Sequence, residues 1–445
     1  MEKIVLVHLS DIHFTRSSNV SVHDLDKNVR NELVLDATKV AKEIGPVTGV
    51  LVTGDIAFSG NKAEYDQATG WLRDFCREIG CPAENVWVVP GNHDVDREKT
   101  KRKVTRTLHQ GIRKEGSDVD RELREILSDE QSASALLEPL TEYNTFAGAF
   151  GCSISATKHF WERDLSLACG TAIRLRGLTS ALVSNESDKR PEIVLGAAQA
   201  SVERASGVIH MTLCHHPPDW FRDHDAVEDH LKSKVHIQLF GHKHSQRLDE
   251  INGKVRLVAG AMHPERSEGG WLPTYNFLEI SRRDNSRIGL RVYQRQWNQP
   301  DTNFIACRDP NNGKDHREFV WSGFPPATTD SPDTVASHEA RGAGVTESAQ
   351  SPAANTANDK DDAMPPPNHE RRLTYRFLTL PFRHQIAVAK NLDVLTDSDR
   401  ALSDEALFRV LFKRAAELGL IGKLWSETEK LHDNPEDFNP FETSK

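Results

Sequence analysis

Long apolar runs are missing from this sequence. No stretch approaches the roughly 20 consecutive apolar residues that a membrane-spanning helix needs. The N-terminal MEKIVLVHLSDIHF is apolar over too short a length for a signal peptide and lacks a small-residue cleavage site. Six cysteines are scattered without a CxxC pair, which indicates reduced, mostly buried thiols. We therefore expect a cytoplasmic protein that does not bind membranes.

A strong excess of positive charge is also absent. The net charge is −10, so the field of the whole molecule repels nucleic acid at long range. A local basic surface remains compatible with this sum, because binding depends on where the charges lie. The chain has 445 residues, too many for one ordinary core, and this length predicts two or three domains.

Short apolar runs rich in β-branched residues occur at 3–9, 47–53 and 85–90, and each leads into a polar loop: SDIHF, GDIAFSG and GNHDVDR. An amphipathic helix is predicted between the second and third runs, at 62–79. This order of strand, loop, helix and strand predicts a layered α/β fold, in which ligand sites lie at the carboxyl ends of the strands.

The rest of the first 324 residues divides into two parts. Residues 98–150 are charged and poor in strand patterns, which predicts a helical insertion. Strand patterns then resume, and the last of them alternate as in the antiparallel part of a sheet. They lie at 172–182, 207–214, 235–240, 255–260, 274–281 and 287–294.

The composition changes at about residue 325. Residues 325–370 contain no aromatic residue and almost no large aliphatic one, which predicts a disordered linker. Residues 371–445 regain apolar residues at helical spacing, and we expect a small all-α domain there, with Leu411 and Trp425 in its core.

Candidate metal ligands follow the predicted strands. Asp11 and His13, like His242 and His244, are spaced i, i+2, so on an extended chain both side chains of a pair project to one face. Asp55 can bridge two ions with its carboxylate, Asn92 offers a carbonyl oxygen, and His215 closes a strand. Mixed nitrogen and oxygen ligands suit Mn, Fe, Zn, Co or Ni, and the sequence does not choose among them.

The motifs DxH, GD, GNHD, H and GHxH in this order resemble the calcineurin-like metallophosphoesterase superfamily over about residues 1–300. TGDIAFSG, VPGNHDVDR and CHHPPDW are most similar to the bacterial branch that includes cyclic-nucleotide phosphodiesterases. The resemblance implies a two-sheet α/β sandwich flanked by helices and a site with two divalent metal ions. One ion would be held by Asp11, His13, Asp55 and His244, and the other by Asp55, Asn92, His215 and His242.

The resemblance also implies the chemistry. Two ions about 3.5–4 Å apart generate a hydroxide near neutral pH and hold the phosphoryl oxygens. His93 would protonate the leaving group or stabilise the transition state, and Asp94 would orient His93 by accepting its other N–H. The ligand is assigned to His215 rather than His216, because the family pattern is His-x-Pro. The expected function is hydrolysis of a phosphodiester in a nucleotide or nucleic acid.

Other interpretations remain open. The enzyme could be a phosphomonoesterase or protein phosphatase, or the domain could be a metal-binding scaffold, although no ligand is missing from the motifs. The basic run KTKRKVTR at 99–106 is either a solvated helix face or a contact for a nucleic-acid backbone. Arg97 likewise is either solvated or in contact with substrate phosphate.

The C-terminal helices contain no cluster of catalytic side chains. Residues 371–445 resemble the helical effector-associated, death-like adaptor domains of bacterial conflict and signalling systems. The resemblance implies that this part recruits a protein partner, with a plain helical appendage as the alternative. The sequence does not identify the partner or the oligomeric state.

Overall fold

The computed structural model describes residues 1–15, 25–114, 118–185, 187–262 and 272–324, and part of 373–431. In that last part the described residues are 373, 377, 380, 382–392, 414, 415 and 417–431. The chain separates into two compact units, Met1–Pro332 and Asp333–Lys445. The predicted linker at 325–370 lies outside the described residues, and so does Leu411.

The first sheet has the strand order β12-β11-β10-β1-β2-β3, with β13 paired to β11. β1, β2 and β3 are parallel, while β10 pairs with β1 in the antiparallel sense. The carboxyl ends of β1, β2 and β3 therefore meet at one edge. The strands are β1 (Lys3–Leu9), β2 (Gly49–Val52), β3 (Val86–Val88), β10 (Thr274–Arg282), β11 (Arg287–Asn298), β12 (Asn303–Ala306) and β13 (Arg317–Ser322).

The second sheet has the order β4-β5-β6-β7-β9-β8. Its four central strands are parallel, and β4 and β8 are antiparallel edge strands. The strands are β4 (Phe160–Ser166), β5 (Ala172–Leu178), β6 (Val208–Cys214), β7 (Ile237–Phe240), β8 (Arg247–Ile251) and β9 (Lys254–Val258).

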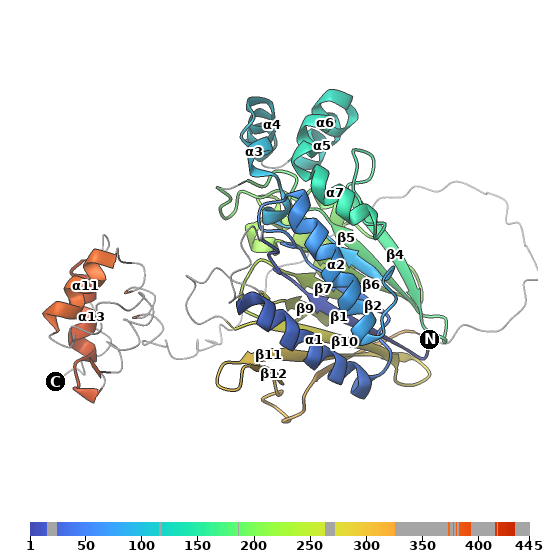
Figure 1. The fold of residues 1–445 in the computed structure, drawn as a ribbon. Coiled ribbons are helices and arrows are strands. Elements are labelled where there is room, and N and C mark those ends of the chain that lie inside the picture. The colour runs from blue at the N-terminus through green and yellow to red at the C-terminus, as the bar shows by residue number, and fades with distance from the viewer. Residues whose placement is uncertain are drawn as a thin grey trace, which may run out of the picture. The chain divides into compact units, whose positions relative to one another are not determined.

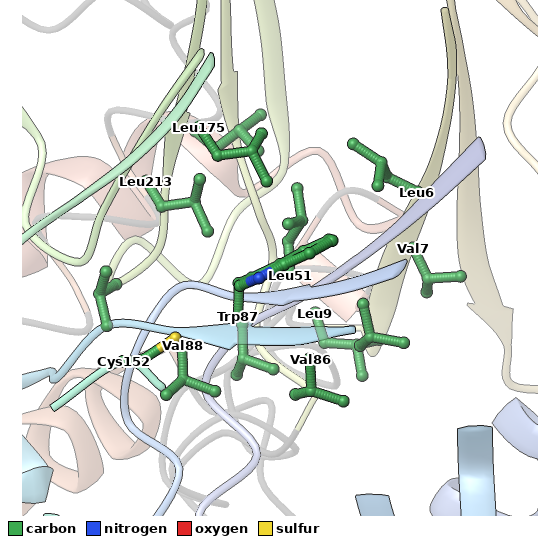
Figure 2. Close-up of a cluster of buried hydrophobic side chains, with 14 of the residues drawn as sticks. Leu6, Val7, Leu9, Leu51, Val86, Trp87, Val88, Cys152, Leu175 and Leu213 are labelled. Carbon is green, nitrogen blue, oxygen red and sulfur yellow. The ribbon is translucent and has the colours of Figure 1, made fainter. Parts of the chain in front are cut away.

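The main core lies between the two sheets. Figure 2 shows Leu175 and Leu213 of the second sheet pointing toward Trp87 of the first, and all three side chains are at most 4% exposed. Burying apolar area of this kind stabilises a fold by about 25 cal/mol per Å². Trp87 also fills the space above Gly49, where a Cβ atom would lie 2.2 Å from its ring.

Helices cover the outer faces of both sheets. α1 (Leu25–Ile44) and α2 (Lys62–Ile79) lie on the first sheet (Figure 1). α2 begins with a capping box between Asn61 and Glu64 and ends at Gly80 in a left-handed conformation. α8 (Ala197–Ala200) and α9 (His224–Lys234) share a second core with the outer face of β5, β6 and β7. The predicted α/β sandwich of two sheets flanked by helices is confirmed.

A group of helices follows the third motif in the chain and precedes β4 (Figure 1). Their inner faces join the main core through residues such as Ile112, Leu136 and Tyr143. They begin directly after the short helix η1 (Asn92–Asp94). The helices are α3 (Arg97–Thr100), α4 (Lys103–Lys114), α5 (Val119–Ser128), α6 (Glu130–Leu137), η2 (Glu138–Leu140) and α7 (Thr141–Gly148).

The C-terminal unit contains α11 (Phe382–Asn391) and α13 (Ile421–Glu429), so a small helical region is present as predicted. Trp425 is 1% exposed and packs with Phe377, Val388 and Leu424 in a separate core, which confirms its predicted burial. Among the described residues of the chain, no helix is long and apolar enough to cross a membrane.

Candidate metal centre

The loop after β1 carries Asp11 and His13 next to the loop after β2. The N–H of Asp11 donates to the carbonyl of Gly54 at 3.1 Å, and that of His13 donates to the carbonyl of Asp55 at 3.0 Å. Both residues have left-handed backbones, with φ of 53° and 51°. The extended i, i+2 geometry predicted for this pair is therefore wrong. His242 also has a left-handed φ of 64°, so the same correction applies to the pair His242 and His244.

Asp55 lies at the centre of the candidate site and is 2% exposed. Its Oδ1 accepts the backbone N–H of His93 at 2.8 Å, which fixes the carboxylate. Its Oδ2 lies 3.3 Å from Nε2 of His215 and 3.8 Å from Nε2 of His13. Gly91 permits this approach, because a Cβ atom there would lie 2.1 Å from Asp55 Oδ1.

One group of ligand atoms gathers around His215, which is fully buried. Its Nε2 lies 3.0 Å from Asn92 Oδ1 and 3.2 Å from His242 Nδ1. Its Nδ1–H donates to the carbonyl of Thr53 at 2.8 Å, which leaves Nε2 as the nitrogen that a metal ion would bind. Neighbouring ligands of an ion with bonds of about 2.1 Å are separated by about 3.0–3.4 Å, so these separations fit a bound metal.

A second group joins Asp11, His13 and His244, whose ligand atoms lie within 4.8 Å of one another. Asp11 Oδ2 accepts the N–H of His242 at 3.2 Å and the hydroxyl of Ser10. Its Oδ1 is buried without a hydrogen-bond partner, 4.0 Å from Nε2 of His244. A buried carboxylate oxygen without a donor is a costly arrangement that a cation relieves. The residues present therefore fit a metal ion at this position as well.

The charges in the site depend strongly on one another. Burial opposes protonation of His215, but the Asp55 carboxylate outweighs it and raises the pKa of His215 to about 9. Burial raises the pKa of Asp11, whereas His215 and His93 hold the pKa of Asp55 well below its ordinary value despite burial. Burial and the charge of His215 lower the pKa of His242 far below 6.5. A bound cation would displace the proton of His215.

The ring of His93 lies 4.6 Å from that of His13, which belongs to the second group. Its Nδ1–H donates to the carbonyl of Phe58 at 2.8 Å. The prediction that Asp94 accepts this proton is wrong, because the Phe58 carbonyl is the acceptor. The arrangement still leaves Nε2 as the nitrogen available for proton transfer.

Asp94 instead connects two of the loops. It is fully buried and accepts the N–H groups of Ile56, Ala57 and Gly91 at 2.9–3.2 Å. It also accepts the hydroxyl of Tyr65 at 3.0 Å. Burial and the charge of Asp55 raise the pKa of Asp94 to about 6. These contacts hold the segment with Asp55 against the segment with Asn92 and His93.

His216 and Trp220 complete the wall beside His242. His216 is fully buried, and its Nδ1 lies 2.9 Å from the hydroxyl oxygen of Ser180. Its ring is 4.5 Å from that of His242, and the two histidines with His215 form a further group able to hold a metal. Trp220 lies edge-on to His242 at 4.1 Å. Sequence reasoning missed Trp220, whose only signal is its place in HHPPDW.

Comparisons with known proteins agree with this arrangement of motifs. A family model described as calcineurin-like phosphoesterase matches residues 4–246. A second model, described as GTPase-associated adaptor domain, matches residues 369–430. The uncharacterized metallophosphoesterase-like protein YydB of Bacillus subtilis is 30% identical over 99 residues. That match covers 22% of this chain and only 19% of the relative's length.

Solved structures of low identity also match. A conserved uncharacterized protein of Streptococcus pneumoniae, a predicted phosphoesterase, is 12% identical with a TM-score of 0.29, covering 72% of this chain and 99% of that one. Vps29 of Chaetomium thermophilum is 10% identical with a TM-score of 0.28, covering 72% and 99%. A putative 5'-nucleotidase of Staphylococcus aureus is 11% identical with a TM-score of 0.34, covering 75% and 56%.

Proposed function

Starting from the fact that the chain belongs to the calcineurin-like phosphoesterase family, we propose that it hydrolyses a phosphodiester in a nucleotide or nucleic acid. The observation that carries the proposal is the position of Asp55. Its Oδ2 lies between Nε2 of His215 and Nε2 of His13, at 3.3 and 3.8 Å. A carboxylate placed between two groups of ligands is suited to bridging two ions.

The proposed ligands fall into two sets that share Asp55. Asp11, His13, Asp55 and His244 would hold one divalent ion, and Asp55, Asn92, His215 and His242 the other. The mixture of nitrogen and oxygen donors favours Mn, Fe, Zn, Ni or Co over Mg or Ca. When bound, the ions would supply Lewis acidity and lower the pKa of a water molecule.

Side chains and backbone groups of the protein would protonate the leaving group and position the ligands. His93 is positioned as the general acid for the leaving group, since the Phe58 carbonyl occupies its Nδ1–H and leaves Nε2 for the substrate. The backbone N–H of His93 holds Asp55 at the same time. Asp94 acts as a positioning residue, because its contacts are to backbone N–H groups and Tyr65 and none is to the ring of His93.

We also propose that residues 371–445 recruit a protein partner in the cytoplasm, in a bacterial conflict or defence system. The match to a GTPase-associated adaptor domain supports a partner linked to a GTPase. The helical unit has a core of its own, as expected of a recruitment module. Recruitment would keep the phosphoesterase domain close to its substrate.

A panel of substrates and metals tests the activity. The metal-free full-length protein is loaded in turn with Mn, Fe, Zn, Ni, Co and Mg. It is then assayed with an aryl phosphomonoester, an aryl phosphodiester, cyclic nucleotides and oligonucleotides. The proposal predicts turnover of diesters with a transition metal. Turnover of monoesters alone would support a phosphomonoesterase or protein phosphatase, and no turnover with any metal would support a scaffold.

A further inference from the structure

The segment that follows the third motif is strongly basic. Residues 97–114 contain eight Lys or Arg and one Glu, in a chain whose net charge is −10. They form α3 and α4, which are exposed to solvent on one side. Such a concentration of one sign of charge creates a local positive potential within an otherwise negative molecule.

Helix α4 follows the third motif closely in the chain, and its far end is bonded to the segment after β5. Before it, Arg97 Nη2 of α3 lies 3.1 Å from Nδ1 of His93. At its far end, Arg113 Nη2 donates to the carbonyl of Val183 and to Asp188, each at 2.7 Å. That segment follows β5 and contains Ser180, which contacts His216 beside the proposed ligand His215. The residues just before α4 and at its end thus contact two segments that also carry residues of the site.

Three of the four cations of α4 face away from the protein, and Arg113 is the exception. Its buried side consists of Thr105, His109 and Ile112. Lys103, Arg106 and Lys114, here called the basic strip, are exposed. Within the described part of the chain none of the three forms an ion pair, whereas the preceding Lys101 and Arg102 pair with Glu98 and Glu138. The strip thus retains charge for an external anion.

We propose that the basic strip binds the phosphate backbone of a nucleic-acid strand whose scissile phosphodiester lies in the metal centre. This inference rests on the proposed function and narrows its substrate class. Helix α4 is about 18 Å long, so it can contact several successive phosphates. Arg97 extends the positive charge from the basic strip to His93. The matching ligand is therefore one polyanion with phosphates at both the strip and the metal centre. Phosphate contacts position the strand without reading its sequence.

Neutralising the strip tests the inference. One full-length variant carries Lys103→Gln, Arg106→Gln and Lys114→Gln. Its matched control carries Lys39→Gln, Lys42→Gln and Arg73→Gln, which remove the same charge from exposed positions of α1 and α2. Binding of a fluorescein-labelled 12-nucleotide DNA or RNA strand is measured by anisotropy on the metal-free proteins at several salt concentrations. Hydrolysis of bis(p-nitrophenyl) phosphate is measured on the manganese-loaded proteins.

The strip variant should bind the strand about tenfold or more weakly, and its slope of log Kd against log salt should fall by about 2, since each single-strand phosphate contact contributes about 0.7. The control should stay within about twofold, and aryl diester hydrolysis should be equal in all three proteins. Equal weakening in both variants, or no strand binding by the wild type, would overturn the inference. If the wild type bound the strand but hydrolysed no phosphoester, the proposed function would be wrong, whereas the assignment of the basic strip as a strand-binding surface would still hold.

Discussion

At the scale of single residues, backbone strain is concentrated in the metal centre. Asp11, His13, Asp55 and His242 all have φ between 51° and 64°. A non-glycine residue in this region costs about 1 kcal/mol or more, and such residues cluster at functional sites. The loops after β1 and β2 hold two of them by backbone hydrogen bonds to each other. The fold thus maintains an unfavourable conformation that turns four side chains toward one point.

His93 gives a prediction on the leaving group. His93→Ala should lower turnover by roughly 10²–10⁴ for substrates with alkoxide leaving groups, as expected for loss of a general acid. The loss should be much smaller for nitrophenyl esters, whose leaving group needs no proton. Metal content should not change, because the contact to Asp55 comes from the backbone N–H of residue 93. Equal losses for good and poor leaving groups would rule out the acid role.

Asp94 gives a prediction on stability. Asp94→Asn replaces an acceptor by a donor that faces backbone N–H groups, which should lower the free energy of unfolding by about 2–4 kcal/mol in urea titrations. Metal affinity should fall too, since Asp94 holds the segments with Asp55 and Asn92 together. Tyr65→Phe removes a single hydrogen bond to the same carboxylate and serves as the milder control. If both variants lost equally little stability and metal affinity, the positioning role of Asp94 would be refuted.

At the scale of elements, the sequence predicts those helices and strands whose apolar residues recur at a regular spacing. α2 was predicted at its observed bounds, because its buried stripe is regular. β4 was missed: only Trp161 of its seven residues is buried, and its Glu162 and Asp164 pair with arginines of β5. An edge strand of this kind forms because its partner strand is present, and charged side chains hide its pattern.

The site shows the same division. The seven candidate ligands were predicted from residue type and order, and His93 from the resemblance to the family. The structure brings these residues together. The carbonyls of Thr53 and Phe58, which orient His215 and His93, could not be predicted. Every residue has a carbonyl, so a backbone acceptor leaves no mark on the sequence. The role assigned to Asp94 failed for this reason.

Strand β1 gives a prediction on pH. His8 is fully buried, and burial lowers its pKa from 6.5 to about 3. Between pH 3 and 6.5, His8 is protonated in the unfolded chain and neutral in the folded one. The stability that neutral His8 provides is therefore complete above pH 6.5 and falls as pH falls. The slope is about 1.4 kcal/mol per pH unit. The free energy of unfolding of His8→Gln should be lower than that of the wild type, and this difference should be about 2 kcal/mol smaller at pH 5 than at pH 7.5.

Urea unfolding of both proteins in EDTA measures this effect. The other histidines contribute equally to the two proteins and cancel in the difference. Gln retains a group able to bond to Thr53 Oγ1, which His8 Nε2 contacts at 2.9 Å. A deficit that stays constant with pH would show that His8 titrates normally in the folded state.

At the scale of the whole molecule, the two units have separate cores. Among the residues that the structure describes, the core of the C-terminal unit consists of side chains between Leu373 and Trp425, all from that unit. Deleting residues 325–445 should therefore leave hydrolysis of a small aryl diester within a few-fold of normal. A partner captured by the full-length protein should no longer bind. An inactive or insoluble truncated protein would show that the helices belong to the catalytic domain.

The central claim is that Asp55 joins two metal ions, and metal stoichiometry tests it most directly. Elemental analysis of the manganese-loaded protein should find two ions per chain, and Asp55→Asn should hold fewer and lose at least about 10²-fold in turnover. Asp66→Asn, an exposed position of α2, is the matched control and should keep both ions. One ion per wild-type chain, or near-normal turnover with two ions in Asp55→Asn, would contradict the account.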